Sequence, residues 1–186
     1  MSTNLSANRK NSIYALSRAA VFTAVTCILA PLSIPIGPVP ISLTNLVLYL
    51  SLYLLGWKLA TASLITYLAI GLVGVPVFSG FTGGAGKLLG PTGGYLVGFL
   101  PMVLLAGWLI DHTPKRWMQL LALILGTAVC YAFGTAWFCY ETKSALSIAL
   151  GACVFPFIPL DLLKIGIAML LGPMLHKRLV QAGLLQ

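Results

Sequence analysis

Long apolar runs, separated by short polar or glycine- and proline-rich junctions, make up most of the chain. A helix needs roughly 20 consecutive apolar residues to cross a bilayer. Because runs that approach this length follow one another, the pattern predicts an all-α membrane protein with six transmembrane helices. The predicted spans cover about 13–34, 43–55, 59–73, 95–110, 117–138 and 145–175.

Polar residues at the start of the chain, including Arg9 and Lys10, predict a short flexible tail over 1–12. The six-helix substrate-binding domain then covers 13–178, and a second short tail covers 179–186. A basic segment before an apolar run is also typical of a signal peptide. A retained first span is favoured because more spans follow and no clear Ala-x-Ala cleavage site does.

Two segments interrupt the helical pattern with proline and glycine. The segment 31–40 predicts a turn or a partly extended linker near one membrane face. The segment 74–94 has too many glycines for a helix, yet it is too apolar for an ordinary solvated loop. Irregular backbone at membrane depth is tolerated where protein buries it or where it lines a cavity. We therefore expect a cavity-lining outer loop between the third and fourth spans, with an inert surface connector as the alternative.

Composition agrees with a membrane protein, since 59% of the residues are hydrophobic and only 8% are charged. A soluble domain does not carry so much apolar surface, because its exterior must be wetted. The net charge of +8 is not arranged as a basic stripe with interleaved aromatic residues, which argues against nucleic-acid binding.

The excess of basic residues has a topological explanation. Six spans place both termini on one side, and eight of the 11 Lys and Arg residues fall on that side. Lys87 and Lys143 fall on the other side, and Lys164 lies within a span. Cytoplasmic segments are enriched in Lys and Arg, so we expect a multi-pass protein of the cell membrane with both termini in the cytoplasm. The eight inner residues are Arg9, Lys10, Arg18, Lys58, Lys115, Arg116, Lys177 and Arg178.

The last apolar run carries Asp161 and Lys164, three positions apart. On a helix this spacing places both side chains on one face. Ionisable groups in a membrane segment are costly, and they usually face the bundle interior and mark a substrate or ion site. The alternative is a buried structural ion pair that neutralises itself.

The predicted topology places Asp161, Lys164 and the glycine-rich loop together at the outer side. The loop adds Lys87 as a second positive group. This arrangement indicates an outward-facing pocket with apolar walls and a few convergent polar groups, as small-molecule sites have. A compact molecule with N–H donors, a carbonyl and a carboxylate satisfies all three side chains.

The sequence lacks the motifs that would indicate a nucleotide-binding protein, a metalloprotein or an enzyme. A Walker A loop fails at Phe81 and Leu88, and a dinucleotide fingerprint fails at Leu89. The four cysteines are scattered through apolar segments and the two histidines lie in polar junctions, so we expect no metal site. No nucleophile–base constellation is present, so we expect a protein that is not an enzyme and uses no cofactor.

Small residues in the first span form two Ala-x-x-x-Ala pairs, Ala15 with Ala19 and Ala20 with Ala24. In a bilayer such spacing lets another helix approach closely. The seam fits either a partner subunit or packing within the same bundle.

Four longer motifs follow one another along the chain: Pro38-Val-Pro-Ile-Ser-Leu-Thr-Asn45, Tyr67-Leu-Ala-Ile-Gly-Leu-Val-Gly-Val-Pro-Val-Phe78, Gly90-Pro-Thr-Gly-Gly-Tyr-Leu-Val-Gly98 and Pro156-Phe-Ile-Pro-Leu-Asp-Leu-Leu-Lys164. Together they resemble the BioY biotin-transporter family, in order from about Ala20 to Arg178. The resemblance implies a six-helix substrate-binding S component of an energy-coupling-factor transporter, which binds biotin and takes it up across the cytoplasmic membrane.

The resemblance also implies roles for individual residues. Asp161 and Lys164 correspond to the acid and base that contact biotin, and Lys87 stands where the family usually has an arginine. Ala20 and Ala24 match the motif that docks the transmembrane partner, so a membrane coupling subunit and an ATPase module are the implied partners, or a second copy if the protein works alone. Further implied or candidate contacts to biotin are Asn45, Ser79, Phe78, Phe81 and Tyr95.

One alternative function stays open from the residues alone. A proton-coupled secondary transporter of a small carboxylated solute would use Asp161 as its proton site. Such carriers normally show inverted repeats with paired broken helices, and no convincing internal repeat is present.

Overall fold

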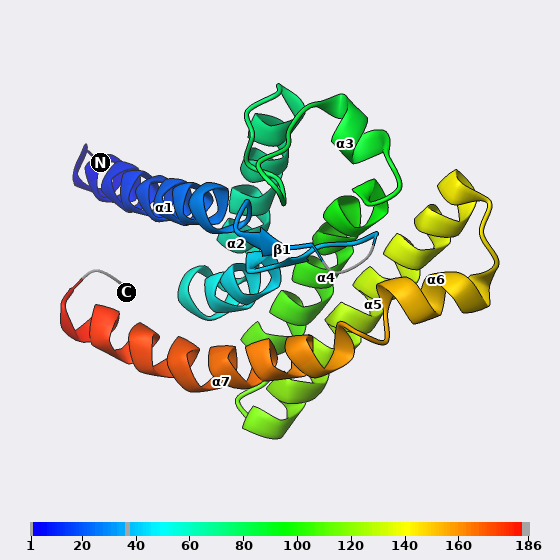
Figure 1. The fold of residues 1–186 in the computed structure, drawn as a ribbon. Helices are drawn as coiled ribbons and strands as arrows, with labels where there is room; N and C mark the ends of the chain where they lie inside the picture. Colours follow the sequence, from blue (N-terminus) through cyan, green and yellow to red (C-terminus); the bar gives the residue numbers. More distant parts are fainter. Residues whose placement is uncertain (1, 36–37, 184–186) are drawn as a thin grey trace.

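The computed structural model describes residues 2–35 and 38–183, with side chains from Ile13 onward. The described chain is almost entirely helical (Figure 1), which confirms the all-α prediction. The elements are α1 (Ser2–Leu29), β1 (Ser33–Ile34), β2 (Ile41–Ser42), α2 (Thr44–Leu72), α3 (Ala85–Leu89), α4 (Gly93–Asp111), α5 (Arg116–Thr142), α6 (Leu146–Cys153) and α7 (Ile158–Gln181).

Four of these helices, α2, α4, α5 and α7, are long and apolar enough to cross a membrane. The apolar part of α1, Ile13–Leu29, is shorter. A membrane protein is therefore confirmed, while the number of six crossings stays a prediction.

The predicted spans 43–55 and 59–73 form the two halves of α2. Gly56, with φ 72° and ψ 167°, breaks the helical geometry between them, and the halves run in different directions (cyan and teal in Figure 1). A positive φ is accessible to glycine without steric cost. Asp111 at the end of α4 stabilises the break, because its Oδ2 accepts a hydrogen bond from the Trp57 N–H at 3.2 Å.

The last apolar run differs from the prediction of one long span kinked at Pro156 and Pro159. The helix ends at Cys153, and a separate helix begins at Ile158. Proline is tolerated in the first turn of a helix, where its missing N–H has no intrahelical partner anyway. Pro159 therefore helps α7 to begin rather than bending a continuous helix.

The termini are also more helical than predicted. α1 begins at Ser2, so most of the segment 1–12 continues the first helix instead of forming an irregular tail. At the other end α7 extends to Gln181, into the predicted tail 179–186. Residues 1 and 184–186 lie outside the described chain.

The two proline- and glycine-rich segments are short ordered structures. In 31–40 and its flanks, β1 and β2 pair antiparallel in the register Ser33↔Ser42, while residues 36 and 37 lie outside the description. The segment 74–94 is irregular except for α3 and the first two residues of α4. It is tied to α5 because Trp137 Nε1 donates to the Gly90 carbonyl at 3.1 Å. Its position at the outer membrane face stays a prediction.

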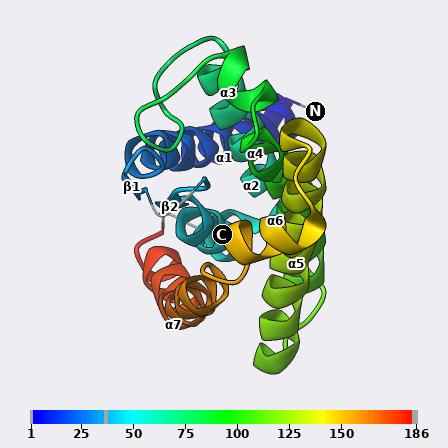
Figure 2. The same cartoon turned by 45° about the vertical axis from the view of Figure 1, so that its right-hand side comes forward.

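The core lies where α2, α4 and α5 meet. α4 and α5 pack closely because Gly126 lies against Ala106 and Gly134 lies against the Tyr95 ring. α7 packs on α2, where Gly172 faces Tyr53. Figure 2 shows α7 on the opposite side of α2 from α1 and α3. These helices leave a space between the start of α2, the start of α7 and the middle of α5.

Candidate functional site

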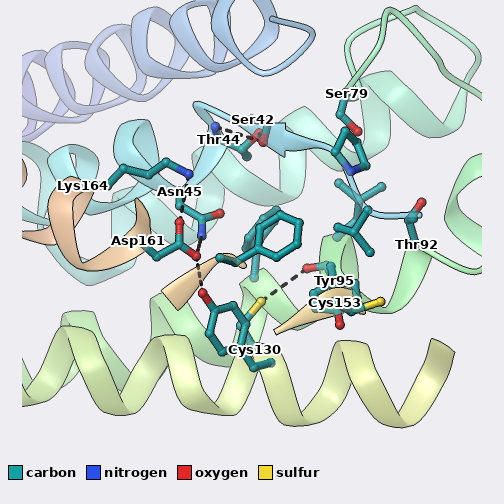
Figure 3. Close-up of a pocket in the computed structure, with 16 residues that line it drawn as sticks. Ser42, Thr44, Asn45, Ser79, Thr92, Tyr95, Cys130, Cys153, Asp161 and Lys164 are labelled. Carbon is teal, nitrogen blue, oxygen red and sulfur yellow. Dashed lines mark hydrogen bonds and ion pairs between the residues drawn. The ribbon is translucent and has the colours of Figure 1, made fainter. Parts of the chain in front are cut away.

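A cavity of about 630 Å³, counting its opening, lies among the ends of α2, α4, α6 and α7 and the middle of α5 (Figure 3). Residues of the linker and of the glycine-rich segment close one side. The polar side chains that line it include Asn45, Ser79, Thr92, Tyr95, Asp161 and Lys164.

The start of α7 places the two charged residues. Asp161 lies in the first turn, where the positive end of the helix dipole favours a carboxylate. Lys164 follows one turn later, and its Nζ lies 2.9 Å from Asp161 Oδ1. The two residues are only 3% and 9% exposed. The prediction that they share one helix face is confirmed, and the pair is both a buried ion pair and part of a cavity wall.

Two further donors hold the other oxygen of Asp161. The amide Nδ2 of Asn45 donates to Oδ2 at 3.0 Å, and the hydroxyl of Tyr131 donates to the same oxygen at 2.6 Å. Three helices thus supply three donors to one carboxylate, as the dashed lines in Figure 3 partly show. A buried charge is stable only when it is paired and hydrogen-bonded, so this network explains how the chain keeps Asp161 inside an apolar bundle.

The opposite wall is mainly aromatic and apolar. Tyr95 lies against Gly134, and its hydroxyl shares a hydrogen bond with Thr135 at 3.1 Å. Phe99 and Phe157 also line the cavity. The site therefore has a polar end around Asp161 and an apolar side suited to a hydrocarbon skeleton.

Five of the predicted binding residues line this one cavity, although they come from distant parts of the chain: Asn45, Ser79, Tyr95, Asp161 and Lys164. Their contact with a ligand stays a prediction. The other three candidates, Phe78, Phe81 and Lys87, do not line it.

Phe78 is a core residue. Its ring is fully buried and packs edge-on against Tyr67, with centroids 5.6 Å apart. Gly71 leaves room for it, since a Cβ at that position would collide with the ring. Phe78 therefore anchors the glycine-rich segment to α2 instead of forming a cavity wall. Phe81, three residues on, is 65% exposed and does not line the cavity either.

Lys87 lies on the short helix α3 and is partly buried. Removal of water from around the amine lowers its pKa. Its predicted contact with a ligand carboxylate stays a prediction, because Lys87 is not among the residues that line the cavity.

The small residues of α1 divide between two faces. Ala19 is buried against α2, next to the Thr23 hydroxyl that meets the Ser63 hydroxyl at 3.0 Å. Ala20 and Ala24 are exposed. Packing within the bundle thus explains Ala19 but not the pair Ala20 and Ala24, whose partner-docking role stays a prediction.

Tyr131 is the main site residue that the sequence reasoning missed. A signal was present, because Thr127, Tyr131 and Thr135 recur every four residues along an otherwise apolar helix. Each of the three bonds a cavity or core residue: Thr127 meets Tyr49, Tyr131 meets Asp161 and Thr135 meets Tyr95. Such a polar stripe in an apolar span indicates a face turned toward the bundle interior.

Together the fold and the cavity define a class, a helical membrane protein that encloses a small-molecule site around a buried ion pair. The chain belongs to the BioY family, whose family model matches residues 1–181. The resemblance found from the motifs is therefore confirmed.

Individual relatives agree with this assignment. This chain is 36% identical to a Thermotoga maritima protein named biotin transporter BioY, and the match covers 87% of this chain and 95% of the relative. The chain is 32% identical to biotin transporter BioY2 of Lactococcus lactis subsp. cremoris, and that match covers 88% of this chain and 91% of the relative. A crystal structure of the S-component for biotin from an ECF-type ABC transporter superposes with a TM-score of 0.83 and 32% identity, over 90% of this chain and 93% of that one. The relatives are transport proteins, so the family is not one of enzymes.

Proposed function

We propose that this protein binds biotin with high affinity and takes it up across the cytoplasmic membrane as the S component of an energy-coupling-factor transporter. The observation that carries the proposal is the carboxylate of Asp161, buried at one end of a cavity and surrounded by Asn45, Tyr131 and Lys164. The named functions of the relatives and the superposition on a biotin S-component support it.

The chemistry of the site matches the two ends of biotin. A carboxylate has about four acceptor positions, and three donors occupy Asp161, which leaves capacity for a ureido N–H. Lys164 has two further N–H donors for the ureido carbonyl. The bicyclic ring and the aliphatic chain pack against Tyr95, Phe99 and Phe157, with the valerate carboxylate toward the segment that carries Lys87.

Membrane placement and partners complete the proposal. The distribution of Lys and Arg supports a location in the cell membrane with both termini in the cytoplasm. The exposed pair Ala20 and Ala24 offers a close-packing surface for a transmembrane coupling subunit, to which an ATPase module binds. If the protein works alone, the same surface suits a second copy.

Binding of radiolabelled biotin to the protein purified in detergent tests this function. We expect saturable binding that unlabelled biotin displaces. In Asp161→Asn and Lys164→Ala, binding should weaken severely, because each change leaves a buried charge without its partner and removes a contact to the ureido group. Absence of saturable binding to the wild type contradicts the function. Affinity close to wild type in both variants contradicts the site instead.

A further inference from the structure

A second hollow lies directly beside the candidate binding cavity. It is an apolar groove of about 500 Å³, counting its opening, between α5 and α7. Its outer rim includes Ala128, Ile158 and Leu162, all of which are exposed, so in a bilayer the groove opens toward lipid. Its floor includes the buried residues Thr127 and Ile165.

Tyr131 and Asp161 are the two residues that line both the groove and the binding cavity. The hydroxyl of Tyr131 donates to Asp161 Oδ2 at 2.6 Å, which is the length of a short, charge-assisted hydrogen bond. The two bonded side chains therefore lie between the binding cavity and the lipid-facing groove.

The same contact determines which oxygen of Asp161 is available. Asn45 and Tyr131 both donate to Oδ2, whereas Oδ1 has Lys164 alone. The free acceptor capacity thus lies on the oxygen that is bonded to Lys164. A ligand with an N–H beside a carbonyl can donate to Asp161 Oδ1 and accept from Lys164 Nζ, which lie next to each other.

We propose that Tyr131 is a positioning residue with two tasks, an inference that rests on biotin as the ligand. Its hydroxyl holds the Asp161 carboxylate in one orientation, so that Oδ1 receives a ureido N–H. Its ring, together with that carboxylate, separates the binding cavity from acyl chains in the groove between α5 and α7.

The first task is tested with Tyr131→Phe, which removes only the hydroxyl. Loss of a hydrogen bond to a charged group should raise the Kd for biotin by about 10-fold or more. A matched control should leave the Kd unchanged. Tyr53→Phe also removes only a buried hydroxyl, and this hydroxyl has no partner among the described residues.

A comparison of two ligands distinguishes loss of the Asp161 orientation in Tyr131→Phe from a general loosening of the fold. Biotin is compared with an analogue that carries a methyl group on one ureido nitrogen. If Tyr131 orients Asp161, Tyr131→Phe weakens biotin more than the analogue, and the preference for biotin shrinks. Equal weakening of both ligands, or no weakening of either, overturns the first task.

The second task is tested without biotin, by labelling Cys130, a thiol that lines the binding cavity. Membranes are treated with a lipid-soluble maleimide or a charged one, and the Cys130 peptide is quantified by mass spectrometry. Tyr131→Ala should increase labelling by the lipid-soluble reagent alone, whereas Tyr131→Phe, which keeps the ring, should match wild type. Unchanged labelling in Tyr131→Ala overturns the partition.

The two readouts keep this inference distinguishable from the proposed function. A wild type that does not bind biotin contradicts the proposed function, and with it the positioning task. The labelling result stands independently, because it depends only on the wall between the two hollows.

Discussion

At the scale of single residues, the geometry around Asp161 favours a functional ion pair with Lys164 over a purely structural one. A pair that serves only to neutralise itself needs no space beside it. Here both side chains line a cavity, and the carboxylate keeps an unused acceptor position on Oδ1. In the structure the two residues pair with each other, and we expect a ligand to add its contacts to that pair.

Lys87 gives a pH-dependent prediction. Partial burial lowers the pKa of its amine below the usual value of about 10.4. The positive charge, which we propose attracts the ligand carboxylate, is fully present below that lowered pKa and is lost as the pH rises through it. We expect the affinity for biotin to fall on the alkaline side before an ordinary lysine would titrate.

Lys87→Arg is the matched control, because arginine stays charged at every pH of interest. The Kd for biotin is measured by equilibrium binding from neutral to alkaline pH. In the arginine variant the alkaline loss of affinity should be smaller or absent. Identical pH profiles for the two proteins would show that Lys87 does not pair with the ligand carboxylate.

How well each contact in the site could be predicted depends on how far apart its two residues lie in the sequence. Asp161 and Lys164 were predicted together because an α-helix fixes the relation of positions three apart. The bonds of Asp161 to Asn45 and Tyr131 join residues 116 and 30 positions apart, which a spacing rule does not reach. Asn45 was found only through the family resemblance. Phe78 was a candidate only as an apolar wall for the ligand, and it packs in the core because hydrophobicity does not distinguish the two positions.

At the scale of elements, apolar runs predicted where helices exist but not how they are divided. The run 145–175 has no polar interruption long enough to mark a break, yet the chain separates α6 from α7 there. The reverse occurs at 56–58, where the predicted turn is reduced to one non-helical residue within α2. Hydrophobicity reports burial or lipid contact, whereas backbone breaks depend on individual glycines, prolines and their tertiary partners.

Gly56→Ala tests the break in α2. The positive φ of 72° is unfavourable for a residue with a Cβ, and a Cβ at Gly56 would lie 3.2 Å from Asp111 Oδ2. The strain should cost about 1–3 kcal/mol and lower the melting temperature of the detergent-purified protein. Thermal unfolding followed by circular dichroism provides the measurement.

Gly166→Ala provides the comparison, because an added Cβ on this α7 glycine meets nothing within 4 Å. Alanine is the better helix former by about 1 kcal/mol, so this variant should be as stable as wild type or more so. If Gly56→Ala is equally stable, the left-handed conformation at Gly56 is not needed for the fold.

At the scale of the whole molecule, the binding site exists only where separate helices meet. α2, α5 and α7 each supply one partner of the Asp161 network, and α4 supplies the aromatic wall. Of the α1 side chains that the structure describes, Ile13–Leu29, none lines the cavity. It packs instead on α2 through Thr23 and Ser63 and presents Ala20 and Ala24 outward. This division suggests that ligand binding and partner docking use different surfaces.

The division predicts that docking can be lost without loss of binding. Replacing both Ala20 and Ala24 with leucine puts bulk where a close helix–helix approach needs small residues. Biotin uptake by cells that contain the complete transporter should fall strongly, and so should co-purification of the coupling subunit. The Kd for biotin of the purified variant should stay at the wild-type value, because neither side chain approaches the cavity. Ala136→Leu, an exposed alanine on α5, controls for added bulk on a lipid-facing surface and should leave uptake unchanged. A loss of biotin binding in the double variant would mean that α1 shapes the site, whereas normal uptake would move the docking surface to another helix.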